Sequence, residues 1–277
     1  MTSAIQKQDD GTIILTITIP AALVKTTRDT LIAEAVKSAD MPGFRKGKAP
    51  KKLVEESLNT EKIKEETLRK LLPDAYIEAV KTHKIKPIIN PQIHVQKLED
   101  GKDWQYTATT CEMPDVDLGN YKKAIGAVTA KSKIVIPGKE EATTEAKLDD
   151  IVKALLETVK VSIPKVLIDS ETERLLAQTL DEIKRLGLTL DQYLGSTGRT
   201  AEALKAEYEQ KAIADMKFEF ALQKISETEK ITVEEKEIDE AIQKAKDEAE
   251  RKHLEGNRYM LASILRQQKT LDFLKNL

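Results

Sequence analysis

From residue 143 to the C-terminus, nearly every segment has its apolar residues at helical spacing, and this pattern most constrains the fold. Charged residues make up 33% of the 277 residues and aromatic residues only 4%. The charged fraction exceeds the roughly 25% of ordinary globular domains, which favours an elongated helical body over one large core. The predicted helices span 144–160, 164–186, 200–227, 233–254 and 257–275.

Two apolar stripes and two capping boxes support this interpretation. Capping boxes are predicted at Thr189 with Gln192 and at Thr232 with Glu235. One stripe comprises Leu175, Leu176, Leu180, Ile183 and Leu186, and another begins with Ile231, Val233, Ile238 and Ile242.

The first 118 residues have a different pattern. Residues 12–19 alternate apolar and polar side chains with many β-branched residues, which predicts a strand ending at Pro20. Strands are also predicted at 92–98 and 104–113, joined at Asp100-Gly101, with Trp104, Tyr106 and Ala108 on one face. Helices are predicted at 21–39 and 51–84, the second burying Leu68, Leu71, Leu72, Ile77 and Val80.

Residues 119–142 combine short apolar pieces with lysines and end near Pro137-Gly138. We therefore expect extended chain here, linking two domains. The predicted organisation is an α+β domain at 1–118, an extended linker at 119–142 and a helical domain at 143–277.

A basic loop between the first two helices is the sharpest candidate site. Residues 41–54 contain five cationic side chains and no acidic one. Phe44 lies among these cations, either as an apolar anchor for a partner or as a side chain folded back onto its own helices. The spacing of Gly43 and Gly47, with Ala49 after Lys48, departs from the nucleotide-binding pattern.

The segment Gly43-Phe44-Arg45-Lys46-Gly47-Lys48-Ala49-Pro50 resembles the ribosome-binding signature of bacterial trigger factor. Residues 12–118 resemble the N-terminal domain of that family throughout. Residues 161–171 and 187–194 resemble parts of its C-terminal domain, in the same order. The resemblance implies an α+β N-terminal domain followed by an elongated all-α C-terminal domain with trigger factor- or SurA-like helical arms.

The resemblance also implies a function. It suggests a cytoplasmic, ATP-independent chaperone that docks beside the exit tunnel of the large ribosomal subunit, on protein and also on rRNA. The docking residues would be Gly43, Phe44, Arg45, Lys46, Gly47 and Lys48. The helical arms would form a cradle for nascent or unfolded polypeptides, and the family can form a homodimer off the ribosome. No cofactor, metal or membrane partner is implied.

The chain departs from the family in one respect. Family members usually carry a prolyl isomerase domain between these two parts, yet only about residues 119–143 separate them here. That is shorter than the ~40 residues that a domain needs to fold unaided. We therefore expect no isomerase activity. A natural short form and an engineered deletion would have the same sequence.

Other enzyme classes find little support. The single cysteine, Cys111, is expected to be a half-buried structural thiol, and the histidines His83, His94 and His253 have no ligand or triad spacing. No secretory signal or membrane-length apolar run is recognised. Two further hypotheses are a ribosome-assembly factor that binds folded ribosomal proteins without holdase activity, and a periplasmic chaperone with a similar helical body. The expected lack of a signal disfavours the latter.

Overall fold

The computed structural model describes residues 1–38, 60–132 and 148–277. The chain divides into two compact units. The first contains residues 1–113 with 164–167, and the second contains 114–163 with 168–277.

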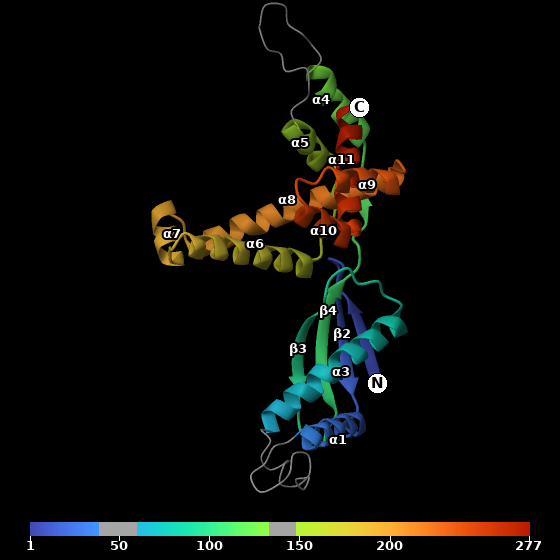
Figure 1. Cartoon of the computed structure of the whole chain (residues 1–277), viewed down its shortest axis with the longest axis vertical. Coiled ribbons are helices and arrows are strands. Elements are labelled where there is room, and N and C mark those ends of the chain that lie inside the picture. The colour runs from blue at the N-terminus through green and yellow to red at the C-terminus, as the bar shows by residue number, and fades with distance from the viewer. Residues whose placement is uncertain (39–59, 133–147) are drawn as a thin grey trace, which may run out of the picture. The chain divides into compact units, whose positions relative to one another are not determined.

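The first unit is built on a four-stranded antiparallel sheet in the order β1-β2-β4-β3. Figure 1 shows helix α3 crossing one face of this sheet. The strands are β1 (Thr2–Lys7), β2 (Thr12–Ile19), β3 (Gln92–Lys97) and β4 (Trp104–Cys111), and the helices are α1 (Ala21–Ser38) and α3 (Thr60–His83).

The core of the first unit lies between this sheet and its helices. In β2, alternate side chains face the core, and Leu15, Ile17 and Ile19 are fully buried. On β4 the predicted face of Trp104, Tyr106 and Ala108 is buried as well. Helix α3 buries a residue at every fourth position: Ile63, Thr67, Leu71, Ala75 and Ala79. These contacts fix α3 on the sheet.

Two expectations for this unit are wrong in detail. Strand β1 was not predicted, because Thr2–Lys7 has little apolar alternation and pairs through its register with β2. Ile77 is 47% exposed, since the buried row of α3 runs through Ala75 and Ala79. The strands predicted at 12–19, 92–98 and 104–113 are otherwise confirmed within two residues.

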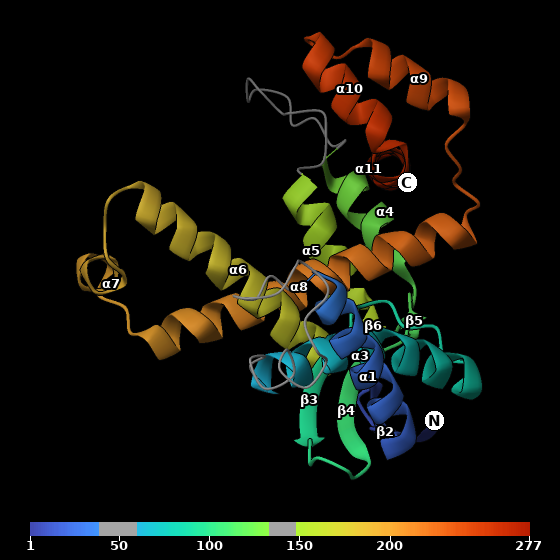
Figure 2. The same cartoon turned by 60° about the horizontal axis from the view of Figure 1, so that its bottom comes forward.

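The second unit is almost entirely helical. Figure 2 shows α7 at the far end of α6 and α8, with α9, α10 and α11 toward the C-terminus. Its helices are α4 (Tyr121–Ser132), α5 (Leu148–Thr158), α6 (Lys165–Arg185), α7 (Leu190–Thr197), α8 (Ala201–Thr228), α9 (Glu235–Gln243), α10 (Glu248–Gly256) and α11 (Arg258–Lys275). The short strands β5 (Val116–Asp117) and β6 (Lys160–Val161) pair beside them.

Helix α4 corrects the prediction of an extended linker at 119–142. Tyr121, Ile125 and Thr129 recur at four-residue spacing, and all three are buried. Tyr121 donates a hydrogen bond of 2.7 Å to the Glu229 carboxylate at the end of α8, and Lys122 Nζ lies 2.7 Å from the same oxygen. Packing on other helices therefore makes this segment helical. The rest of that linker, 133–142, lies outside the described residues.

The helix ends test the two capping boxes. The box at Thr189 and Gln192 is confirmed, with reciprocal hydrogen bonds of 2.9 and 3.2 Å. The box at Thr232 is wrong, because α9 begins at Glu235 and the Glu237 carboxylate accepts from the Glu234 N–H at 2.8 Å.

The helix predicted at 233–254 is divided into α9 and α10. Asp247 lies between them and caps α10, its carboxylate accepting from the Glu250 N–H at 2.7 Å. With these corrections, an α+β N-terminal region followed by a helical C-terminal region is confirmed.

Candidate functional site

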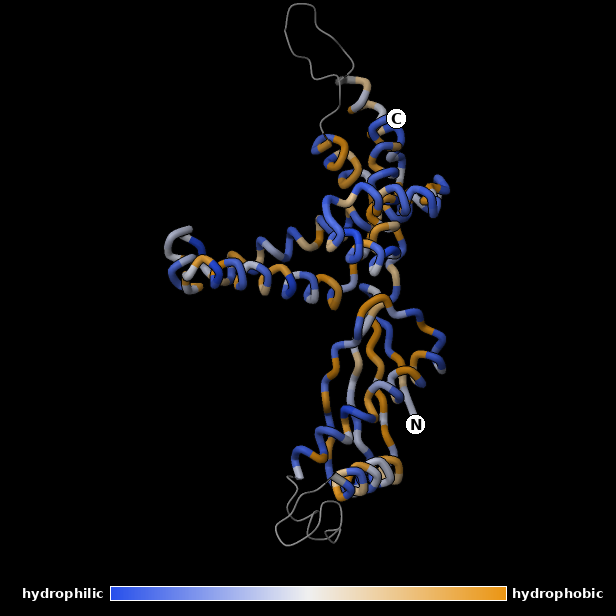
Figure 3. The backbone as a smooth tube through the Cα atoms, in the orientation of Figure 1, coloured by the Kyte–Doolittle hydropathy of each residue, from blue (hydrophilic) through white to orange (hydrophobic). Residues whose placement is uncertain are grey.

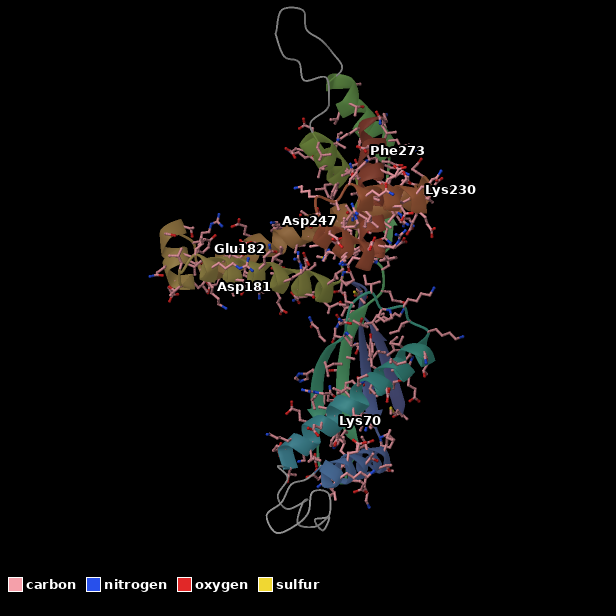
Figure 4. The ribbon with its side chains drawn as sticks, in the orientation of Figure 1. Lys70, Asp181, Glu182, Lys230, Asp247 and Phe273 are labelled. Carbon is pink, nitrogen blue, oxygen red and sulfur yellow. The ribbon has the colours of Figure 1, made fainter. Side chains whose placement is uncertain are left out.

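The six predicted docking residues, Gly43, Phe44, Arg45, Lys46, Gly47 and Lys48, lie outside the described residues. The helices on either side of them in sequence are described. The Lys70 ammonium of α3, labelled in Figure 4, lies 3.7 Å from the Glu34 carboxylate of α1. The docking role of the loop stays a prediction.

A cationic groove in the first unit was not found from the sequence. It has a volume of about 440 Å³ and lies between α1, α3 and the β3–β4 turn. Lys25, Arg28, Lys64 and Lys102 line it together with Asp29 and Asp100. Lys64 Nζ lies 3.1 Å from the Asp100 carboxylate. Lys25 and Arg28 share a face of α1, but only the fold brings them beside residues about 40 and 75 positions away.

Apolar side chains are exposed where α6 leads into α7. Leu186 is 74% exposed, Leu188 40% and Leu180 37%. They belong to the same sequence region as Leu175 and Ile183, which are buried. The α7 helix itself buries no residue. This end of the arm therefore presents apolar surface to solvent.

Exposed acidic residues of α6 lie close in sequence to these leucines. Figure 3 shows hydrophobic and hydrophilic residues interspersed along α6 and α8. Asp181 and Glu182, labelled in Figure 4, are exposed on α6. The Thr179 and Tyr208 hydroxyls are 2.7 Å apart, which ties α6 to α8.

A second exposed apolar surface lies at the start of α11. Tyr259 is 90% exposed, Ile264 51% and Met260 49%. Met260 and Ile264 are four residues apart and so share a face of the helix. Leu261, which follows Met260 directly, packs with Ile238 and Ile242 of α9, and this contact anchors the helix.

These two groups of exposed side chains offer non-directional apolar contact. We call Leu180, Leu186 and Leu188 the arm patch, and Tyr259, Met260 and Ile264 the α11 patch. An apolar polypeptide segment that covers them removes apolar area from water, worth about 25 cal/mol per Å². Such contact requires no particular partner sequence.

Two residues weighed as catalytic candidates in the sequence, Cys111 and His83, lie within the fold of the first unit. Cys111 is fully buried, and this burial, with the Asp10 carboxylate nearby, raises the pKa of its thiol to about 11. The thiol is more deeply buried than the half-buried position that the sequence predicts. His83 Nε2 lies 3.0 Å from the Ser3 hydroxyl. Among the described residues, no cluster of three or more histidine, cysteine or carboxylate side chains could hold a metal ion.

Two family models match the sequence. The model of bacterial trigger factor protein matches residues 1–151, which is more than half of the chain. The chain belongs to the trigger factor family. The model of the trigger factor C-terminus matches residues 133–276, so the two matches overlap.

Trigger factors of Staphylococcus aureus strains JH9 and Newman are each 38% identical to this family member over 122 residues. The alignment covers 44% of this chain and 28% of each relative, so the chain matches less than a third of their length. A solved structure, from work on promiscuous substrate recognition in folding and assembly activities of the trigger factor chaperone, has a TM-score of 0.67. It is 13% identical and covers 100% of this chain and 99% of its own, which shows a shared fold.

The described helices were compared with the length and hydropathy that a membrane span requires. None of the helices in residues 1–38, 60–132 and 148–277 is long and apolar enough to cross a bilayer.

Proposed function

We propose that this trigger factor family member is an ATP-independent chaperone that shields unfolded polypeptides. The observation that carries the proposal is the exposed apolar surface of the second unit, in the arm patch and the α11 patch. Covering a large exposed apolar side chain with an unfolded segment lowers the free energy of both. The neighbouring Asp181 and Glu182 stay hydrated and keep the arm soluble.

Several separate patches suit a chaperone that must release its client. Each patch offers only a few apolar side chains, so each contact is weak and short-lived. Affinity differences between related complexes lie mostly in the dissociation rate. A client that touches several patches gains avidity and still leaves stepwise, without nucleotide hydrolysis.

Aggregation of a chemically denatured client tests this proposal. Leu186→Ser with Leu188→Ser, combined with Tyr259→Ser, Met260→Ser and Ile264→Ser, should reduce suppression of light scattering at least fivefold. The matched control is Lys184→Ser with Arg185→Ser, which alters exposed polar positions of the same arm. Equal suppression by both variants would exclude the patches as client surfaces.

Ribosome docking is the second part of the proposal. The docking loop would be residues 43–48, binding near the exit tunnel of the large subunit, and the match of residues 1–151 to the family model supports it. Phe44→Ala, Arg45→Ala and Lys46→Ala together should abolish co-sedimentation with ribosomes without changing the circular dichroism spectrum. Because the loop is cationic, binding of the unmodified protein should weaken with salt. Undiminished co-sedimentation of the triple variant refutes the docking role.

We also propose that the chain has no prolyl isomerase activity. The overlap of the two family matches at residues 133–151 supports this, because no unmatched stretch separates them. A protease-coupled assay on a proline tetrapeptide should give the uncatalysed rate. Catalysis that co-purifies with the protein through two further chromatographic steps contradicts the proposal.

A second candidate function is assembly of folded ribosomal proteins. The structurally similar chaperone is described with folding and assembly activities, which favours this alternative. An assembly factor without holdase activity would bind a folded ribosomal protein and leave the aggregation of a denatured client unchanged. The chaperone proposal requires delayed aggregation at stoichiometric amounts.

The remaining proposals concern organisation. We propose a cytoplasmic protein with domains at 1–118 and 143–277, and a homodimer off the ribosome formed through the docking and cradle surfaces. Light scattering at increasing concentration should show twice the mass of 31.0 kDa.

A further inference from the structure

Strand β3 forms one margin of the sheet in the first unit. In Figures 1 and 2 it lies beside β4, at the end of the strand order β1-β2-β4-β3. Within the described parts of the chain, no strand pairs with its outer edge. Each of its six side chains is exposed or half-buried. The strand therefore offers a main-chain edge that another strand can reach.

The hydrogen bonds of β3 show which main-chain groups face outward. His94 pairs with Thr107 of β4, and the Thr107 hydroxyl donates to the His94 carbonyl at 3.3 Å. The His94 carbonyl therefore points toward β4. In an antiparallel strand, the N–H and C=O of one residue point to the same side, and successive residues alternate. Ile93 and Val95 consequently direct their N–H and C=O groups away from β4.

The side chains of the same two residues extend the buried face of the sheet. Ile93 lies opposite Ala108, and Val95 lies opposite Tyr106. Ala108 and Tyr106 are buried beneath the helices, whereas Ile93 is 39% exposed. An added strand could place alternate apolar side chains beside Ile93 and Val95, because cross-strand neighbours are about 5 Å apart.

Local features limit the available edge to one short stretch. The register shifts between Val95 and Lys97, and a bulge of this kind interrupts further pairing. The opposite margin, β1, is tied to α3 by the contact of Ser3 with His83 at 3.0 Å and of the N-terminal amine with Glu78 at 3.7 Å. The open edge is thus Gln92–Val95.

We propose that this edge binds an extended segment of an unfolded polypeptide as a fifth strand. The client chain would pair with the N–H and C=O groups of Ile93 and Val95 and place apolar side chains over the margin of the core. Main-chain pairing is the same for every sequence, so this edge would add binding without adding selectivity. The inference rests on the proposed function, because it names a further client site.

The direct experiment follows amide exchange by NMR in the full-length protein. The probe is an eight-residue peptide of alternating valine and threonine at saturating concentration. Exchange of the Ile93 and Val95 amides should slow at least tenfold. The His94 amide already points toward β4, and its exchange should stay within twofold. Equal effects on all three amides, or none, overturn the proposal.

A matched peptide separates main-chain pairing from apolar contact. The same peptide with alternate amides N-methylated keeps its side chains but cannot form the strand ladder on the methylated edge. It should bind at least tenfold more weakly. Unchanged binding means that side-chain contact alone holds the peptide, and it contradicts the proposal.

A pair of proline variants tests the site in the protein. Ile93→Pro removes an outward N–H, which an edge strand tolerates. It should reduce peptide binding at least tenfold. Inward and outward main-chain groups also alternate along β4, β2 and β1, and the strand registers connect them to β3. This alternation places the N–H of Ile5 on the outer edge of β1. Ile5→Pro is therefore the matched control. It should bind the peptide like the unmodified protein. Equal loss in both variants refutes a site at β3.

These outcomes are distinguishable from failure of the proposed function. If the protein suppresses aggregation but the Ile93 and Val95 amides do not respond, the edge inference fails and the chaperone proposal stands. If aggregation is not suppressed while the amides are protected by the peptide, the chaperone proposal fails and the strand site stands.

Discussion

The central strands of the first unit and two helix ends of the second unit differ in how far they bury their apolar side chains. In the first unit, β2 and β4 face the core with side chains such as Leu15, Ile17 and Ala108, none of which is exposed. In the second unit, single helices bury one side and leave residues such as Leu186 and Tyr259 in solvent. A sheet with a closed helix layer supports a rigid fold, whereas helices with partly open faces can also contact a partner.

The largest change in the free energy of unfolding is expected in the sheet of the first unit, and it tests this difference most severely. Ile17→Ala leaves a cavity in a closed core and should lower the free energy of unfolding by about 3 kcal/mol. Leu186→Ala in the arm patch should change it by less than about 0.5 kcal/mol. Urea unfolding of the full chain measures both, and comparable losses would contradict the division between the units.

The next largest effect is expected in the labelling rate of Cys111, which reports how easily reagents reach the sheet core of the first unit. The pKa of the buried Cys111 thiol is raised to about 11, so at pH 8 only about one thiol in a thousand carries the reactive thiolate. Labelling with a coloured disulfide reagent should be at least ~100-fold slower in the folded protein than in urea. Rapid labelling of the folded protein would show that the sheet core opens easily.

A smaller effect is expected at the contacts that hold α4 in the second unit. Lys122 and the Tyr121 hydroxyl both contact the Glu229 carboxylate, and Lys122 Nζ lies 5.9 Å from the centroid of the Phe273 ring, labelled in Figure 4. Glu229→Gln should lower the free energy of unfolding by about 1 kcal/mol, measured in urea. Glu227→Gln, two residues earlier at the end of α8, should have little effect.

The same contacts predict a pH dependence. The Lys122 ammonium, followed by the Tyr121 hydroxyl, lowers the pKa of Glu229 below its ordinary value of 4.5. The unfolded chain therefore takes up this proton at a higher pH than the folded chain does. The stabilisation is complete above pH 4.5 and is lost as the pH falls through the lower, folded pKa. A Glu229→Gln variant that loses stability in the same way between pH 5 and 3 would contradict this assignment.

The smallest expected effect is at the surface between α1 and α3. The Glu34 and Lys70 side chains, 3.7 Å apart, are about half exposed, so water and salt screen their attraction. Glu34→Gln should change the free energy of unfolding by less than about 0.5 kcal/mol. A larger loss would mean that helix pairing, as well as the sheet core, holds the first unit together.

Sequence patterns predicted the features that depend on local chemistry. The alternation in residues 12–19 and the capping box at Thr189 are complete within a few residues, so both could be identified from the sequence. Helix α4 was missed because its stability depends on distant partners such as Glu229. Strand β1 was missed because β2 supplies its hydrogen-bond partners.

The candidate surfaces were less predictable for a physical reason. Leu175 and Leu186 belong to one predicted apolar stripe, yet they are 8% and 74% exposed. Hydrophobic periodicity predicts which face of a helix is apolar. It does not predict where along that face the neighbouring helix ends and the side chains become exposed. The docking residues 43–48 are predicted from a sequence motif alone, and the ribosome co-sedimentation experiment tests this prediction.

The most direct test of the central claim is site-specific photocrosslinking to an unfolded polypeptide stalled on the ribosome. A photoreactive amino acid would replace Leu186 in one variant, Tyr259 in a second, and Lys184, an exposed polar position of the same arm, in a control. Our account predicts at least fivefold more crosslinked client at positions 186 and 259 than at 184. Equal yields at all three positions would contradict the claim that the exposed apolar surface of the second unit binds unfolded chains.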